Sequence, residues 1–311
     1  MAFFSAVCWG SVVVLNKKVL DYINPVPVNF IVLSASTVCL VAIAVPLSLL
    51  HLWPLGFDMS WRAAGYIVAG SFVTWVIAFN AFYFALRSGR AGVVGPITGT
   101  DPLFTALFAV LIVGTALGHL TVAGLLVATA GVVLISRQTH DEAEAHAPVL
   151  EVAAGPAVQE SALLVVTLAV VTAAGWGFSP VMIQLAENEV GGASTTMIVL
   201  GEAFGVLLLG PFLLLRRPPV FTRRLHQGEL RRVCWLVGVT AVLNALFAVI
   251  YYVLIEHIGP VLTTVIVATS PIFTILGGVI FLKERFGRWL ALGAAVTLAG
   301  VIIAILQPVL G

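Results

Sequence analysis

The chain has 311 residues, of which 60% are hydrophobic and 9% are charged, whereas charged residues make up about 25% of an ordinary soluble domain. This composition excludes a water-soluble globular protein. A membrane-spanning helix needs about 20 apolar residues, so ten such helices would take about 200 residues and leave only short loops and a linker. The net charge of +1 gives no basic surplus for binding phosphate backbones, so nucleic acid is not an expected partner.

Apolar segments separated by charged residues, Pro or Gly follow one another along the chain. Most are longer than a transmembrane strand, which has about 9–11 residues, and their apolar residues do not alternate with polar ones. They therefore indicate helices. The first segment carries its lysines after the apolar stretch, which favours a membrane helix over a signal peptide. We predict an all-α, polytopic membrane protein with ten transmembrane helices, at residues 2–20, 27–50, 63–86, 91–113, 119–136, 161–186, 193–215, 233–255, 260–282 and 288–306.

Two of these segments contain Gly and Pro near their middles, GPITGTDP in 91–113 and VATSP in 260–282. Such residues interrupt a helix, and membrane proteins tolerate the interruption where neighbouring helices or a cavity satisfy the freed carbonyls. We therefore expect a helix break in each segment. The stretch 137–160 is acidic and rich in Ala, Pro and Gly without apolar periodicity, and it is predicted to be a linker.

Residues that commonly bind metals or form disulfides give no such pattern here. His140 and His146 lie in the linker without partner ligands, so no metal site is predicted, and no cofactor is expected. Cys8, Cys39 and Cys234 form no CxxC pair and lie in apolar stretches. We expect all three to be small buried hydrophobic side chains.

The second part of the chain repeats the first. A shift of 169 positions aligns TDPLFTALFAVLI (100–112) with TSPIFTILGGVIF (269–281), and a shift of 167 places Trp9-Gly10 on Trp176-Gly177. Five helices per repeat is an odd number, so the second copy is predicted to be inverted in the membrane, as in many secondary transporters. The predicted organisation is a five-helix repeat at 1–136, a linker at 137–160 and a second five-helix repeat at 161–311.

The basic residues give an independent prediction of topology. Fourteen of the 15 Lys and Arg residues fall in odd-numbered loops, and only Arg62 falls in an even-numbered loop. Under the positive-inside rule the odd loops are cytoplasmic, which places both termini on the non-cytoplasmic side of a plasma or inner membrane. The arginine-rich loop at 216–232 fits a topology-setting role, with binding of anionic lipid as the alternative.

Residues 270–305, SPIFTILGGVIFLKERFGRWLALGAAVTLAGVIIAI, and the Trp-Gly pair in each half resemble the EamA-type members of the drug/metabolite transporter superfamily. The shared features are a Pro-containing helix, a turn with Lys283-Glu284-Arg285 and a closing helix with Gly300-Val301. The first half departs from this pattern because residues 114–117, Gly-Thr-Ala-Leu, lack the charged residues of the turn. The resemblance covers nearly the whole chain. It implies ten helices around a central cavity and the export or exchange of small solutes, without naming a substrate.

Two acidic residues lie deep within apolar segments, Asp101 and Glu202. Ionisable groups at such positions are costly and tend to face a cavity or a partner. Both are therefore candidates for substrate binding and for proton coupling, with a purely structural hydrogen-bonded carboxyl as the alternative. The repeat-related positions are Ser270 and Ala35, so both acidic groups break the internal symmetry.

The remaining candidates are polar or aromatic residues at helical spacing from these positions. Trp9 and Trp176 lie near the middles of their segments rather than at the interfacial belt where Trp is usual, so they either line a cavity or pack in the core. Ser and Thr in the same stripes could instead hold membrane helices together. The full set of predicted substrate-binding residues is Trp9, Asn16, Thr98, Asp101, Trp176, Ser179, Glu202, Asn244, Tyr251 and Ser270.

The leading hypothesis is a secondary transporter of a small organic metabolite such as an amino acid, an exporter or exchanger that works by alternating access, with protons as a possible coupling ion. HExxH, GxSxG and Walker motifs are absent from the sequence, which argues against an enzyme and against ATP drive within the chain. The alternatives are a non-transporting membrane scaffold or binding protein and, less favoured, a membrane-embedded enzyme. The expected partners are a small-molecule substrate and the lipid bilayer; the oligomeric state is not predicted.

Overall fold

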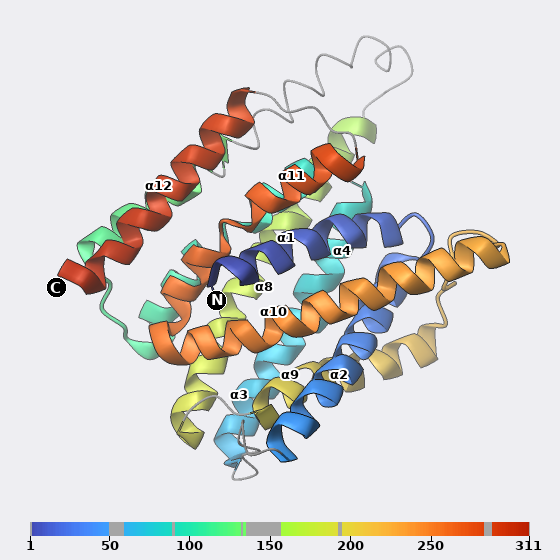
Figure 1. Cartoon of the computed structure of the whole chain (residues 1–311), viewed down its shortest axis with the longest axis horizontal. Helices are drawn as coiled ribbons and strands as arrows, with labels where there is room; N and C mark the ends of the chain where they lie inside the picture. Colours follow the sequence, from blue (N-terminus) through green and yellow to red (C-terminus); the bar gives the residue numbers. More distant parts are fainter. Residues whose placement is uncertain are drawn as a thin grey trace.

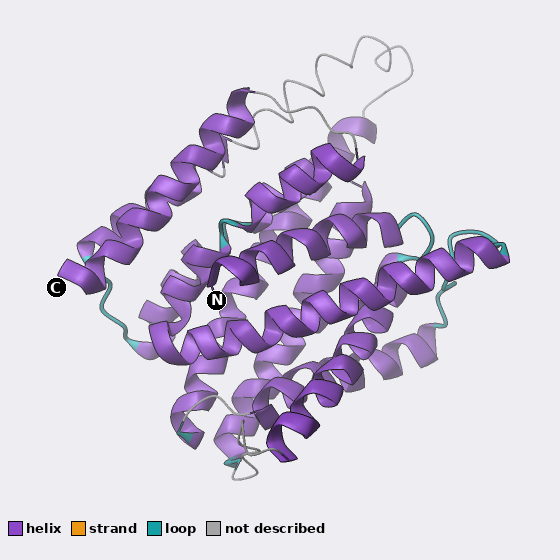
Figure 2. Cartoon of the chain, in the orientation of Figure 1, coloured by secondary structure: helices purple, strands orange, loops and turns teal. Residues whose placement is uncertain are grey.

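The computed structural model describes residues 2–49, 59–88, 91–131, 133–134, 157–191, 195–282 and 288–310. Within these ranges the chain is helical apart from turns, connecting loops and one isolated β-bridge between Ile23 and Phe221 (Figure 2). The predicted all-α class is therefore confirmed. Of the predicted linker, only residues 157–160 are described, and they begin a helix. His140, His146 and the turn at 283–285 lie outside the described residues.

Helices follow one another along both halves (Figure 1). The first half contains α1 (Ala2–Val19), α2 (Pro25–Leu49), α3 (Trp61–Ser71), the π-helical turn η1 (Phe72–Ala78), α4 (Phe79–Ser88), α5 (Ala91–Thr98), α6 (Asp101–Phe108), the π-helical turn η2 (Ala109–Val113) and a helix at His119–Gly131. The second half contains α8 (Ala157–Val190), α9 (Thr195–Arg216), α10 (Gln227–Val267), α11 (Ser270–Leu282) and α12 (Arg288–Leu310).

Apart from the turn at Leu20 and the breaks at 99–100 and 268–269, the described residues of all ten predicted apolar segments are helical. Five helices in the described ranges are long and apolar enough to cross a membrane, and three shorter apolar helices accompany them. The helix α10 has 41 residues and covers more than one predicted segment. A straight helix of this length would extend about 60 Å, twice the thickness of a hydrocarbon core. Gly259 adopts φ 76° and ψ 166° within it, so the helix bends there without a connecting loop.

Both predicted helix breaks are confirmed. The helix α5 ends at Thr98 and α6 begins at Asp101, while α10 ends at Val267 and α11 begins at Ser270. In each case Pro is the second residue of the new helix. Proline is well tolerated in the first helical turn, because the N–H that it lacks would have no intrahelical partner there.

The first helix of each half packs against the broken helix of the other half. A Cβ atom on Gly10 of α1 would lie 2.7 Å from the carbonyl oxygen of Ser270, and one on Gly177 of α8 would lie 2.8 Å from the carbonyl oxygen of Asp101. Any side chain larger than hydrogen would therefore push these helices apart. The contact places the two breaks, and the Trp beside each glycine, at the centre of the helix bundle.

A second pair of equivalent helices, His119–Gly131 and α12, is joined by small residues. A Cβ on Gly124 would lie 2.5 Å from the carbonyl oxygen of Gly300, and one on Gly131 would lie 2.7 Å from that of Gly293. These four glycines correspond under the shift of 169 positions. Small residues let backbones approach closely, which is how membrane helices gain packing energy without a hydrophobic driving force between them.

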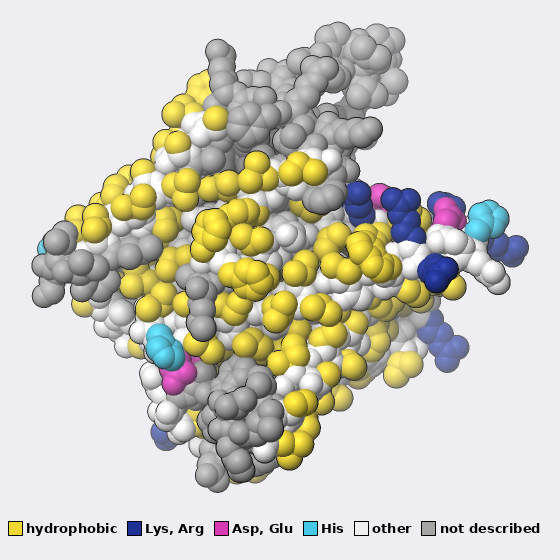
Figure 3. Space-filling view, viewed as in Figure 1, with side chains coloured by type: hydrophobic (Ala, Val, Ile, Leu, Met, Phe, Trp, Pro, Cys, Tyr) yellow, Lys and Arg dark blue, Asp and Glu magenta, His cyan; other side chains and the backbone are white. Residues whose placement is uncertain are grey.

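Basic side chains gather at one end of the molecule, while the broad face in Figure 3 is covered with hydrophobic side chains. The loops after α1 and α9 meet at that end. There the backbone N–H of Asn24 donates to the carbonyl of Val220 at 2.9 Å, and the backbone N–H of Thr222 donates to the carbonyl of Tyr22 at 2.9 Å. The Arg87 guanidinium donates to the side-chain oxygen of Asn24. The basic loops after α1 and α9 and the last turn of α4, which carries Arg87, thus share one end, as their charge predicts.

One expectation about the cysteines is wrong. Cys8 is buried and Cys39 is partly buried, but Cys234 is exposed on the outer surface of α10. A lipid-facing surface is as apolar as the protein interior, so a small apolar side chain can occupy either place.

Candidate functional site

A cavity with about 870 Å³ of empty space, its opening included, lies between helices from both halves. It is lined by α1, α3, η1, α4 and α6 from the first half and by α8, α9 and α10 from the second. The π-helical turn η1 contributes Thr74 and Trp75 to the lining, which fits the frequent occurrence of such turns at functional sites.

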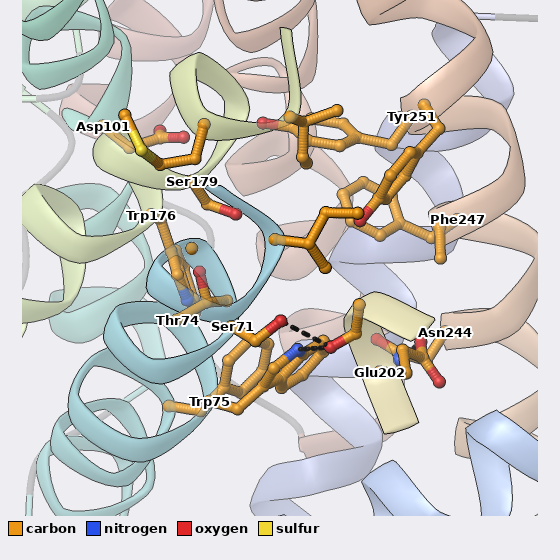
Figure 4. Close-up of a pocket in the computed structure, with 18 of the residues that line it drawn as sticks. Ser71, Thr74, Trp75, Asp101, Trp176, Ser179, Glu202, Asn244, Phe247 and Tyr251 are labelled. Carbon is orange, nitrogen blue, oxygen red and sulfur yellow. Dashed lines mark hydrogen bonds between the residues drawn. The ribbon is translucent and has the colours of Figure 1, made fainter. Parts of the chain in front are cut away.

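Most of the residues predicted from sequence to contact a substrate lie around this one cavity (Figure 4). They come from five helices, and they were selected on separate grounds: intramembrane charge, central Trp and helical spacing. The cavity-lining members of the predicted set are Trp9, Asp101, Trp176, Ser179, Glu202, Asn244 and Tyr251.

Asn16, Thr98 and Ser270 are buried outside this cavity, which corrects the expectation that they line it. Asn16 lies seven residues beyond Trp9, which is about 10 Å along the helix axis and past the end of the cavity. The Thr98 hydroxyl donates to the carbonyl of Gly95 at 2.9 Å. Ser270 lies in the close contact between α11 and Gly10.

Glu202 of α9 is held by three neutral donors. Its Oε1 accepts hydrogen bonds from Ser36 Oγ at 3.0 Å and from Asn244 Nδ2 at 3.2 Å, and its Oε2 accepts one from Thr37 Oγ1 at 3.3 Å. Asn244 Nδ2 also donates to Ser36 Oγ at 3.0 Å. The network joins α2, α9 and α10, so it fixes the orientation of this carboxyl and connects the two halves.

Asp101 is held differently. It is the first residue of α6, where unpaired backbone N–H groups favour a negatively charged side chain. Thr105 Oγ1 donates to its backbone carbonyl at 3.1 Å. No side chain in the described ranges donates to its carboxylate, which borders the cavity close to Ser179 (Figure 4).

Aromatic rings form much of the wall between these two carboxyls. The Trp9 ring centroid lies 5.0 Å from that of Trp176 and 5.0 Å from that of Phe247, and the Phe247 ring lies 5.1 Å from Tyr251. These spacings are those of edge-to-face and offset aromatic contacts. Trp9 thus packs against cavity-lining rings from the second half while it lines the cavity itself.

Several lining residues were missed in the sequence. Trp75 Nε1 and Ser71 Oγ both donate to the carbonyl of Gly201, at 3.2 and 2.8 Å (Figure 4). Trp75 has the signal that identified Trp9, because it also lies near the middle of an apolar segment. Ser36 and Thr37 do not line the cavity but donate to Glu202. Their sequence signal is that they directly follow Ala35, the residue that the repeat relates to Glu202.

The cavity has an unbalanced charge. The described residues that line it include Asp101 and Glu202 but no Lys, Arg or His, and the ion pairs Arg62–Glu189 and Arg223–Glu229 lie elsewhere. A buried carboxyl without a cationic partner has to be neutralised by a proton or by a bound cation. No group of three metal-binding side chains occurs in the described part of the chain.

Comparison with known proteins identifies the family. No curated protein matches the chain. Of the 28 matching chains among solved structures, one described as "Crystal structure of protein" is 17% identical with a TM-score of 0.68, and the match covers 98% of this chain and 96% of that one; this similarity concerns the fold. The sequence profile of the EamA-like transporter family matches residues 1–137 and 163–306. The chain therefore belongs to the EamA-like transporter family.

Proposed function

We propose that this protein is a secondary transporter that carries a small organic metabolite through the cavity by alternating access. Its moving parts are two inverted five-helix repeats, 1–136 and 161–311, which together form ten transmembrane helices, with both termini on the non-cytoplasmic side of a plasma or inner membrane. The observation that carries the proposal is a cavity lined by both halves and bordered by Asp101 at a helix break. Transporters built from inverted repeats place their sites at such breaks.

The same cavity supports coupling to protons. Asp101 and Glu202 are its two carboxyls, and no basic side chain lines it. Intramembrane carboxyls serve as proton carriers in pumps and transporters. Exchange of a proton at one of them for substrate would let a proton gradient drive export.

The test is flux in liposomes containing the purified protein. An amino-acid and amine mixture is supplied with and without an imposed pH gradient, and accumulated solutes are identified by mass spectrometry. We expect accumulation that requires the gradient, and we expect Asp101→Asn or Glu202→Gln to abolish it while exchange of solute for solute persists.

The matched control is Glu189→Gln. Glu189 is an acidic residue near the end of α8 that pairs with Arg62 and does not line the cavity. It should accumulate solute like the unaltered protein. Absence of flux for every solute contradicts the transporter proposal. Normal accumulation by both cavity variants contradicts proton coupling at these carboxyls.

A further inference from the structure

We infer that the cavity selects a substrate with a positively charged amino group on an aromatic or other apolar body, and that Asp101 is the carboxyl that binds this group. The consequence for transport rests on the proposed function. The ligand class itself rests on the chemistry of the cavity lining.

Charge determines the class of ligand. Two carboxyls border one largely apolar cavity without a basic lining residue. An anionic ligand would add a third acidic group to a site of low dielectric, where like charges repel far more strongly than in water. A neutral ligand would leave the charge of an ionised carboxyl uncompensated, so that this carboxyl would have to take up a proton instead. A cation is the ligand that gains from this arrangement.

Hydrogen bonding distinguishes the two carboxyls. Both oxygens of Glu202 already accept bonds, from Ser36, Thr37 and Asn244. Asp101 receives no bond from any described side chain, although it borders the cavity. An ammonium group has three donors and no acceptor, so it fits the carboxyl to which no described side chain donates. Figure 4 shows Asp101 and Glu202 on opposite sides of the cavity, so one small ammonium group does not serve both.

The walls complete the site for an apolar or aromatic body. Trp176, Phe247 and Tyr251 line the same cavity as Asp101 (Figure 4), and aromatic faces attract cations as well as apolar groups. Trp176 Nε1 and Thr74 Oγ1 are buried without a hydrogen-bond partner among the described residues. Buried polar atoms of native proteins usually have partners, so these two are available for a neutral polar atom on the same ligand.

The test is binding of matched ligands to the purified protein at neutral pH, measured by titration calorimetry. Each set contains an amine, the alcohol and the carboxylic acid of one body, with phenylethyl, indolylethyl and hexyl bodies as the panel. The best amine should bind at least about 10-fold more tightly than its alcohol, which is the gain expected from one charged hydrogen bond. The acid should bind more weakly than the alcohol.

Two variants locate the binding carboxyl. Asp101→Asn keeps the size of the side chain and should reduce the preference for amine over alcohol to less than about 3-fold, because a neutral amide forms a weaker bond to ammonium. Glu202→Gln should keep most of the preference. Thermal melting of each variant establishes that it is folded, and the ligand panel on the unaltered protein decides the substrate class even where a variant does not fold.

The possible outcomes separate this inference from the proposed function. If no amine in the panel binds more tightly than its alcohol, the inferred ligand class is wrong, while liposome flux of other solutes would still support a transporter. If amines bind but no solute crosses the membrane, the transporter proposal fails and the ligand class stands. A full preference for amine in Asp101→Asn overturns the role of Asp101.

Discussion

The two helix breaks have the same backbone and different chemistry. Each new helix begins one residue before a proline, and each is approached by a glycine from the other half. In each new helix a threonine hydroxyl donates to the carbonyl of the first helical residue: Thr105 to Asp101 at 3.1 Å and Thr274 to Ser270 at 3.2 Å. Only the break in the first half carries a carboxyl, that of Asp101, and this carboxyl lines the cavity together with Glu202. Packing is therefore repeated while the functional group is not.

A second pair of positions follows the same rule. Glu202 has Ala35 as its repeat-related residue, and α2 and α9 pack against each other with Ser36 and Thr37 bound to Glu202. Close packing is needed in both copies because it closes the bundle. A further buried carboxyl at Ala35 or Ser270 would add an unfavourable desolvation energy, which disfavours repeating the carboxyl in the other half.

The largest expected effect comes from the duplicated packing. Gly10→Val and Gly177→Val should each destabilise the protein by about 3 kcal/mol or more, because overpacking of this kind forces the backbone to move. Each added Cβ would lie under 3 Å from backbone atoms of the facing helix. Thermal melting by fluorescence-detected size-exclusion chromatography, together with the folded yield, measures this loss.

Controls for that comparison are Gly65→Val and Gly238→Val, one in each half, where an added Cβ meets nothing within 4 Å. They should melt close to the unaltered protein, because Val has a helix propensity at least as high as that of Gly. If Gly10→Val melts like these controls while Gly177→Val does not, the two contacts are not equivalent.

The duplication explains why much of this arrangement could be predicted from sequence. Gly and Pro within two apolar segments predicted the helix breaks, which the structure places at 99–100 and 268–269 and the gapless match places at equivalent positions of the halves. Intramembrane charge identified Asp101 and Glu202. Both signals come from rules that hold without three-dimensional information: a break needs Pro or Gly, and a buried carboxyl needs a cavity or a partner.

The rest of the site depends on how each helix is rotated and how far the cavity extends, which spacing alone does not give. Asn16 shares a face with Trp9 but lies beyond the cavity. Ser71 and Trp75 line it at the junction of α3 and η1, and which face of that segment turns to the cavity depends on how the helix packs. The hydrogen bonds of Ser36 to Glu202 and Asn244 are long-range contacts that no local pattern specifies.

Exchanging the chemistry of the two breaks sharpens the comparison further. Asp101→Ser copies the second half, so it should leave the melting temperature within a few degrees of the original while lowering substrate flux about 10-fold or more, the loss of one charged hydrogen bond. Ser270→Asp should destabilise the protein by about 2.5–3.5 kcal/mol, the cost of a charge deep in a membrane protein. Melting and liposome flux measure the two effects.

The double variant Asp101→Ser with Ser270→Asp is the decisive comparison. We expect no recovery of flux, because Ser270 lies outside the cavity and against Gly10. Recovery would mean that the two breaks are functionally interchangeable, contrary to the asymmetry described above.

The smallest effect concerns the network around Glu202. Ser36→Ala removes the hydroxyl that binds both Glu202 and Asn244, so it should lower stability by about 1–3 kcal/mol, the penalty for leaving a buried polar group unsatisfied. Thr37→Val removes a longer hydrogen bond to Glu202, at 3.3 Å, and should cost less. Both are measured by thermal melting.

Ser34→Ala is the matched control on the same helix, since the Ser34 hydroxyl is buried without a partner among the described residues. Removing it should leave the melting temperature unchanged or slightly raised, because an unsatisfied hydroxyl gives no stability. If Ser36→Ala and Thr37→Val are both tolerated as well as Ser34→Ala, then α2 does not hold Glu202. Glu202 would in that case be positioned by the second half alone, without any contribution from the residues that follow Ala35.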